Sequence, residues 1–144
     1  MTTMAELDVS KPLPAITTEA KPFWDAAAQQ KLMIQRCQEC KAWVWTPRPS
    51  CNECGSEKVD WTPMSGNGEI YSFTVIRQVV GRAASQAFEP DIPYVIAWVD
   101  LAEGPRLITN IIGCPADEVK LGMKVVVQFE QATEKVWLPK FRPA

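Results

Sequence analysis

The chain has 144 residues, of which 47% are hydrophobic, and its formal net charge is -2. This length is enough for one domain with its own hydrophobic core, and the charge argues against a phosphate-backbone partner, because nucleic-acid binders usually display a basic surplus. The chain has no histidine, so any catalysis would have to use Asp, Glu, Lys, Tyr or Cys side chains as acids and bases.

The first part of the chain divides into an irregular tail and a short helix. Residues 1–20 contain two prolines and show no sustained period, which predicts a flexible tail. After it, Pro22 suits a first helical turn, and apolar residues recur at helical spacing, which predicts a helix over residues 21–31. The aromatic pair Phe23 and Trp24 could pack on the protein itself or meet a partner protein, and we favour packing.

Two Cys-x-x-Cys pairs dominate the next segment. Cys37 and Cys40 form the first pair, and Cys51 and Cys54 form the second. Two thiolates at this spacing can hold one ion, and a second pair brought over by a hairpin completes four sulfur ligands at about 2.3 Å from zinc. Such a closed site leaves no position for water, so it stabilises a fold and performs no Lewis-acid chemistry. The pattern therefore predicts a structural zinc site.

Other uses of these cysteines fit less well. Disulfides would suit a small secreted scaffold, but we see no signal-peptide pattern at the start of the sequence. A redox pair does not need a second pair nearby, and iron–sulfur clusters use different spacings. Zinc is favoured, and an iron site or a metal-free site are the remaining alternatives. Four metal-bound thiols among five cysteines indicate a reducing compartment, so we expect a cytoplasmic protein. No apolar run approaches the length of a membrane span, so we expect no membrane partner.

Short strands are predicted on both sides of each cysteine pair. Residues 32–36 enter the first pair, residues 42–46 leave it, and residues 58–61 close the unit. Prolines at positions 47 and 49 break pairing between the two cysteine pairs. We therefore expect a rubredoxin-like zinc ribbon over residues 32–63, a fold too small to stand without its ion.

Residues 64–144 have the pattern of β-structure. After a glycine-rich turn, residues 69–80 alternate, with Ile70 on one face and Tyr71, Phe73 and Val75 on the other. Further strands are expected at residues 94–101, 106–112, 123–131 and 136–141, with one helical turn at residues 115–119. This order is typical of a five-stranded OB barrel, and the gaps are too short for the crossover helices of a parallel sheet. The expected fold class is therefore mainly β: an N-terminal helix and a rubredoxin-like zinc ribbon, followed by a five-stranded OB-fold barrel.

Several short motifs follow one another along the chain. They are Pro22–Asp25, Ile34–Cys40, Pro47–Cys51, Gly68–Val75, Pro93–Ala97 and Leu138–Pro143. With these motifs and all four cysteines, the chain resembles the DUF35 family of zinc-ribbon, OB-fold, acyl-CoA-associated proteins over residues 21–144.

The resemblance implies a non-catalytic companion of an enzyme. Proteins of this family associate with thiolase-like enzymes, which include thiolases, acyltransferases and steroid side-chain aldolases, and help to hold the acyl-CoA. The resemblance thus implies an accessory subunit of a thiolase-like or aldolase complex in lipid or steroid metabolism, which shares acyl-CoA with its catalytic partner. We expect no enzyme activity from the chain by itself. The missing histidine agrees with this, because the nucleophile and base would belong to the partner.

Three residues are candidate contacts for coenzyme A. This cofactor offers phosphates, an adenine ring and a long pantetheine arm, so its site needs cations, an aromatic platform and a narrow channel. Arg77 and Arg82 follow the first predicted barrel strand, and Phe88 lies in the same loop. A charged, solvated loop is the alternative reading. The segment 137–142 could cover the barrel or dock into a partner.

A second hypothesis, from a different class, is a single-stranded nucleic-acid-binding module. OB barrels and zinc ribbons commonly bind single-stranded nucleic acids. The predicted β-strands of the barrel carry the aromatic residues Tyr71, Phe73 and Trp98, on which bases could stack. Aromatic residues that stack on bases usually lie in a groove lined by basic residues. The chain has a net negative charge and is not expected to form such a groove, so we expect no nucleic-acid partner. A self-sufficient enzyme that uses Cys114 is a third hypothesis, but the sequence shows no set of catalytic partner residues for this thiol.

Overall fold

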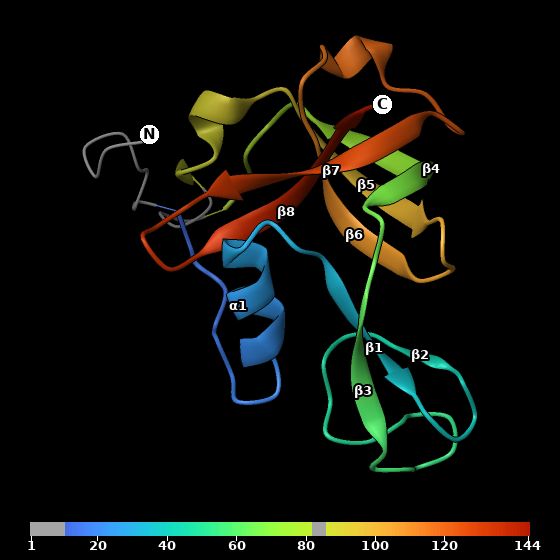
Figure 1. Cartoon of the computed structure of the whole chain (residues 1–144). Coiled ribbons are helices and arrows are strands. Elements are labelled where there is room, and N and C mark those ends of the chain that lie inside the picture. Colours follow the sequence, from blue (N-terminus) through green and yellow to red (C-terminus); the bar gives the residue numbers. More distant parts are fainter. Residues whose placement is uncertain (1–10, 82–85) are drawn as a thin grey trace.

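The structure is a computed structural model, and it describes residues 11–81 and 86–144 (Figure 1). In these residues the secondary structure is mainly β, with one short α-helix and single turns of 3-10 helix, which are labelled η. The elements are α1 (Lys21–Ala28), β1 (Met33–Cys37), β2 (Trp43–Val44), β3 (Val59–Pro63), β4 (Asn67–Ile76), η2 (Glu89–Asp91), β5 (Tyr94–Leu101), β6 (Arg106–Ile111), η3 (Ala116–Glu118), β7 (Lys124–Gln131) and β8 (Trp137–Pro143).

The helix α1 presents one aromatic side chain to the interior. It is shorter than the helix expected over residues 21–31, because Gln30 takes a left-handed backbone conformation with a φ of 63°. Phe23 is buried, and the centroid of its ring lies 4.9 Å from that of Trp24 and 5.1 Å from that of Trp45. Phe23 therefore packs inside the protein, as favoured from the sequence.

Strands β1, β2 and β3 form an antiparallel sheet in the order β2-β1-β3. β1 pairs with β3 along its whole length, from Met33 opposite Pro63 to Cys37 opposite Val59. β2 is shorter than the strand expected at residues 42–46, because the prolines that follow it cannot donate hydrogen bonds to a ladder. Figure 1 shows this sheet projecting below the barrel, with α1 beside it.

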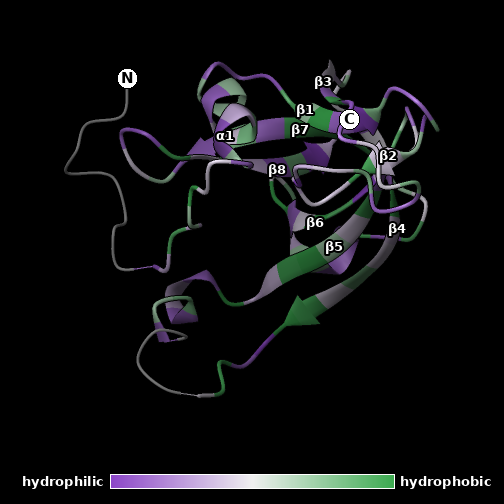
Figure 2. Ribbon diagram, turned by 90° about the horizontal axis from the view of Figure 1, so that it is seen from below, coloured by the Kyte–Doolittle hydropathy of each residue, from purple (hydrophilic) through white to green (hydrophobic). Residues whose placement is uncertain are grey.

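Strands β4 to β8 form a closed barrel in the order β4-β5-β6-β8-β7, so the mainly β fold with an OB-like barrel is confirmed. Neighbouring strands are antiparallel except β6 and β8, which run parallel and meet at Ile111 and Phe141. Phe141 and Val99 are fully buried in the core, and Leu32 and Ile34 belong to the same cluster. Hydrophobic residues follow β5 and the end of β4 in Figure 2. The base of the ribbon and the barrel thus share one hydrophobic core.

β4 departs from the alternation that its sequence predicts. Its pairing with β5 shifts register between Ile70 and Ser72, so Tyr71 is the extra residue of a β-bulge. Ile70 is buried in the core, and Phe73 and Val75 beyond the bulge pack against the same core. The expectation that Tyr71, Phe73 and Val75 share the face opposite Ile70 was wrong, because a bulge moves the alternation by one residue.

The other barrel elements follow the sequence pattern closely. β5 occupies the predicted residues, and η3 supplies the helical turn expected at residues 115–119. β4 ends at Ile76 instead of residue 80, because its last partner is Tyr94 and the preceding Pro93 has no N–H to continue the ladder. In the described part of the chain, no helix has the length and apolar character needed to cross a bilayer.

Candidate metal centre and barrel pocket

The four cysteine sulfurs of the ribbon converge on one point. All four Sγ atoms lie within 4.8 Å of one another. The Sγ atoms of Cys37 and Cys54 are 3.6 Å apart, and those of Cys40 and Cys51 are also 3.6 Å apart. In a tetrahedral site with zinc–sulfur bonds of about 2.3 Å, neighbouring sulfurs are separated by about 3.8 Å. The four cysteines are therefore positioned to bind one metal ion.

Both cysteine pairs lie in turns of the same construction. The residue after each pair has a left-handed backbone, with a φ of 64° at Lys41 and 77° at Gly55. The N–H of Lys41 donates to the carbonyl of Cys37 at 3.1 Å, and the N–H of Gly55 donates to that of Cys51 at 3.0 Å. Within the second turn, the N–H of Glu53 also donates to Sγ of Cys51 at 3.3 Å. These turns direct backbone donors toward sulfur, which favours thiolate ligands.

The sulfurs differ in how readily they lose their protons. A hydrogen bond from the Cys40 backbone lowers the pKa of Cys37 to about 6, and one from the Cys54 backbone lowers the pKa of Cys51. The Ala42 backbone acts in the same direction on Cys40, but burial and the neighbouring sulfurs outweigh it and raise the pKa of Cys40 to about 12. Four thiolates this close together repel one another, so complete deprotonation requires a cation among them.

Gln35 holds the chain that leads into the second cysteine pair. Its side chain is buried. Its Nε2 donates to the carbonyl of Arg48 at 3.0 Å, and the N–H of Arg48 donates to its Oε1 at 2.8 Å. These two bonds replace the strand pairing that the prolines at 47 and 49 prevent. Sequence reasoning missed Gln35, because a single Gln on a strand carries no sign of a partner 13 residues away.

A pocket of about 490 Å³ opens at one end of the barrel. Its walls come from residues 11–13, from η2, β5 and β6, and from the β7–β8 hairpin. Phe88 lies in the wall, with its ring centroid 6.1 Å from that of Tyr94. The ammonium group of Lys11 lies 5.7 Å from the same Phe88 centroid. We call this cavity the Phe88 pocket.

The charged groups of the Phe88 pocket are paired. Lys11 lies 2.6 Å from a carboxylate oxygen of Asp91, and Lys140 lies 2.8 Å from one of Glu130. Both ammonium groups thus lie beside carboxylates, and most of the remaining lining is apolar, including Leu138. Such a pocket can receive a ligand with an apolar body and a few polar groups.

The three predicted coenzyme A contacts are placed differently. Phe88 lines the pocket, whereas Arg77 does not, and Nη2 of Arg77 lies 2.9 Å from Oδ1 of the exposed Asp117. Arg82 lies outside the described residues. Sequence reasoning missed the pocket lysines, because Lys140 and the segment 11–13 reach this loop only through the tertiary fold.

Cys114 lines the same pocket and is partly buried. Burial raises the pKa of its thiol, with a further contribution from the negative charge of Glu118. The thiol is therefore protonated near neutral pH, which suits a small apolar wall residue better than a nucleophile.

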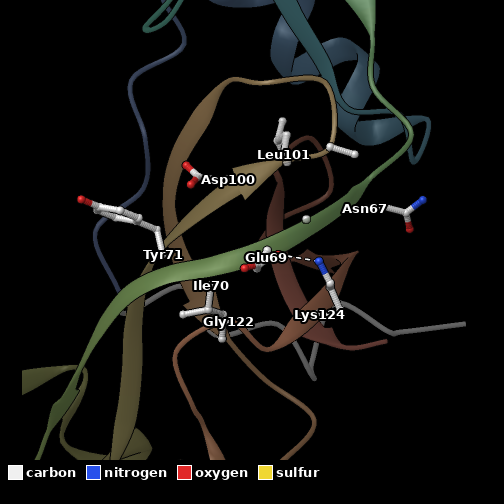
Figure 3. A pocket seen from close by; sticks show the side chains of 10 residues that line it. Asn67, Glu69, Ile70, Tyr71, Asp100, Leu101, Gly122 and Lys124 are labelled. Atoms are coloured by element: carbon white, nitrogen blue, oxygen red, sulfur yellow. Dashed lines mark hydrogen bonds and ion pairs between the residues drawn. The ribbon is translucent and has the colours of Figure 1, made fainter.

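A second pocket of about 490 Å³ lies where β4 meets β7. Figure 3 shows Glu69 of β4 and Lys124 of β7 facing each other in an ion pair. Tyr71 and Asp100 also line this pocket, and both lie away from Asn67 in this view. The charged groups of this pocket are therefore paired as well, since Asp100 is bound by Arg106.

Two family models match consecutive parts of the chain. Residues 24–60 match the model described as "ChsH2, rubredoxin-like zinc ribbon domain". Residues 61–130 match the model described as "ChsH2, C-terminal OB-fold domain". Together these matches cover α1 in part, the whole ribbon sheet and most of the barrel.

Known proteins are similar over much of the chain. A "Probable enoyl-CoA hydratase alpha subunit" of Thermomonospora curvata is 40% identical over 134 residues, which cover 93% of this chain and 40% of that protein. The "Benzoylsuccinyl-CoA thiolase subunit BbsA" of Thauera aromatica is 28% identical over 63% of this chain and 62% of its own length. This chain thus spans less than two thirds of either relative. A solved structure described as "Ltp2-ChsH2(DUF35) aldolase" matches with a TM-score of 0.78 and 38% identity, over 91% of this chain and 98% of that one.

Proposed function

Because this chain belongs to the DUF35 family of ChsH2-type zinc-ribbon and OB-fold proteins, we propose that it is a non-catalytic accessory subunit of a thiolase-like or aldolase complex. The observation that carries the proposal is its likeness to a chain of the structure described as "Ltp2-ChsH2(DUF35) aldolase", over 98% of that chain. Relatives named as subunits of an enoyl-CoA hydratase and of a benzoylsuccinyl-CoA thiolase support an acyl-CoA substrate.

The residues of this chain support an accessory role. The chain has no histidine, and the four clustered cysteines form a complete set of ligands for one ion. We propose that the ion is zinc and that Cys37, Cys40, Cys51 and Cys54 hold it as a purely structural site. The nucleophile and the general base would then come from the catalytic subunit. Since thiolate ligands persist in reducing surroundings, we also propose that the complex works in the cytoplasm.

We propose that the Phe88 pocket takes part of an acyl-CoA shared with the catalytic subunit. The rings of Phe88 and Tyr94 offer an apolar platform for the pantetheine or acyl chain. Arg77 and Arg82 are the proposed contacts for the phosphates. The exposed pair between Arg77 and Asp117 contributes about 0–1 kcal/mol, so Arg77 can exchange this carboxylate for a phosphate at low cost.

The proposed function is tested by affinity capture of the tagged chain from its native cells. We expect a thiolase-fold polypeptide to copurify in a fixed ratio, as identified by mass spectrometry. The reassembled complex should convert an acyl-CoA that the chain alone leaves unchanged. A chain that turns over a thioester unaided, or that remains a monomer with no thiolase-like companion, would contradict the proposal.

The reassembled complex also tests the Phe88 pocket. Phe88→Ala should raise KM for acyl-CoA by about five- to tenfold with kcat unchanged, because one aromatic contact contributes about 1 kcal/mol to binding. Val80→Ala is the control, since Val80 is strongly exposed and lies outside the pocket. An unchanged KM in Phe88→Ala would place the acyl-CoA elsewhere.

A further inference from the structure

The outer face of β4, β5 and β6 carries a row of exposed large side chains. Tyr71, Trp98 and Ile108 are 56%, 43% and 57% exposed. Trp98 lies opposite Ile108 in β6 and opposite Ser72, the neighbour of Tyr71, in β4. Isolated exposed apolar residues are ordinary, but a row across three adjacent strands is typical of an interaction surface.

The β-bulge fixes one end of this row. It turns Tyr71 outward, where the guanidinium carbon of Arg106 lies 3.5 Å from the centroid of the ring. The same guanidinium donates to both carboxylate oxygens of Asp100, from Nε at 2.6 Å and from Nη2 at 3.1 Å. A side chain held between a ring and a carboxylate has little freedom left to lose on binding. Ordered Arg, Tyr and Trp side chains commonly supply most of the free energy of an interface.

The charges on and beside this face are balanced within the protein. Asp100 is paired with Arg106, and Glu69 is paired with Lys124 next to it (Figure 3). A phosphate backbone would have to compete with both carboxylates for these cations. An uncharged partner surface would cover the face without leaving a charge unpaired. The electrostatics therefore favour an apolar protein surface over a nucleic acid.

We propose that this face, formed by Tyr71, Trp98, Ile108 and the Arg106–Asp100 pair, binds the catalytic subunit through an apolar patch of that subunit. The inference rests on the proposed function, because it assigns a surface to that partner. None of the five residues lines the Phe88 pocket, so the proposed partner surface and the proposed acyl-CoA site use different residues.

Binding of the purified chain to its catalytic subunit, measured by isothermal titration calorimetry, tests the inference. Trp98→Lys and Ile108→Lys should each raise Kd by at least about tenfold, because each places a charge in an apolar contact, and Arg106→Ala should raise it by about tenfold. Leu121→Lys is the control, since Leu121 is 68% exposed and does not belong to β4, β5 or β6. Circular dichroism checks that each variant is folded. If a lysine variant is not folded, the alanine variant at the same position, Trp98→Ala or Ile108→Ala, is measured instead.

The outcomes separate the inference from the proposed function. If the wild-type chain binds the catalytic subunit and the face variants bind as tightly, the inference is wrong and the proposed function stands. If the wild-type chain binds no thiolase-like protein, both are wrong. If Trp98→Lys instead abolishes self-association or the binding of a single-stranded oligonucleotide, the face serves a second copy or a nucleic acid, and the inference is wrong.

Discussion

At Gly66 the backbone needs a positive φ and also passes close to a neighbouring strand. Its φ is 89°, and a Cβ built there would lie 2.5 Å from Cγ1 of Val127. Gly122 has a similar φ of 78°, but its Cβ would meet nothing closer than Oε1 of Glu69 at 3.7 Å. The two glycines therefore separate the cost of a left-handed backbone from the cost of a steric clash.

We expect Gly122→Ala to lower the free energy of unfolding by about 1–2 kcal/mol, because alanine is strained in the left-handed region. Gly66→Ala should lower it by about 1–3 kcal/mol more, because the added methyl group overpacks the contact with Val127. Urea unfolding of the metal-loaded protein, followed by tryptophan fluorescence, measures both. Equal losses in the two variants would show that Val127 moves aside freely.

The two ends of the zinc ribbon differ in how much hydrophobic packing stabilises them. At the barrel end, Leu32 and Ile34 belong to the main hydrophobic core. At the cysteine end, the buried cluster consists, within the described residues, of Cys37, Val44 and Cys51. So small a cluster cannot offset the entropy of ordering the chain around it, so we expect this end to need a bound metal ion.

Removal of the metal by a chelator, or the change Cys51→Ser, should therefore unfold the cysteine end and leave the barrel folded. Hydrogen exchange should become fast for amides in residues 37–59, while β5 and β6 stay protected. Cys114→Ser should keep both the metal and the protection, because Cys114 lies in the Phe88 pocket, apart from the sulfur cluster. A cysteine end that stays protected without any metal would refute this prediction.

The whole barrel closes where its last strand returns to β6. β8 pairs with β7 along its length, but it meets β6 at a single parallel pair, Ile111 and Phe141. The N–H of Ile112 donates to the carbonyl of Phe141 at 2.8 Å, and the Phe141 ring is fully buried. One buried aromatic residue near the end of the chain thus anchors the closing seam.

Phe141→Ala should lower the free energy of unfolding by about 3–5 kcal/mol, because it removes a fully buried ring at the seam. Phe141→Leu should cost clearly less, since it keeps most of the apolar volume. Urea unfolding measures both variants. A loss below about 1 kcal/mol in Phe141→Ala would show that the Phe141 ring does not anchor the seam.

Features that depend on neighbouring residues in the sequence could be predicted before the structure. The spacing of the cysteines predicted the cluster of sulfurs, and alternation with turn residues predicted the order of the barrel strands. The bulge at Tyr71 could not be predicted, because it depends on how β4 pairs with β5. The stacking of Arg106 on Tyr71 follows from that bulge and was missed for the same reason.

The candidate ligand site was harder to predict than the metal site. Phe88 and Arg77 lie near each other in sequence, yet Phe88 lines the pocket and Arg77 pairs with Asp117 outside its lining. The lysines of the pocket are residue 11, which precedes α1, and residue 140 in β8, and both line the pocket only in the folded chain. Such pairings depend on tertiary packing, which local patterns do not encode.

The side-chain amide of Gln35 forms its two hydrogen bonds with the main chain of Arg48, not with the Arg48 side chain. Any residue except proline can therefore replace Arg48 without loss of this contact, because the contact uses only the main-chain N–H and carbonyl of position 48. Gln35 itself cannot be replaced in the same way. Glu lacks the N–H donor for the carbonyl of Arg48, and the side chain of Asn is one methylene too short to reach the main chain there. The side chain at position 48 is therefore free to vary, while one buried amide keeps the shape of this loop.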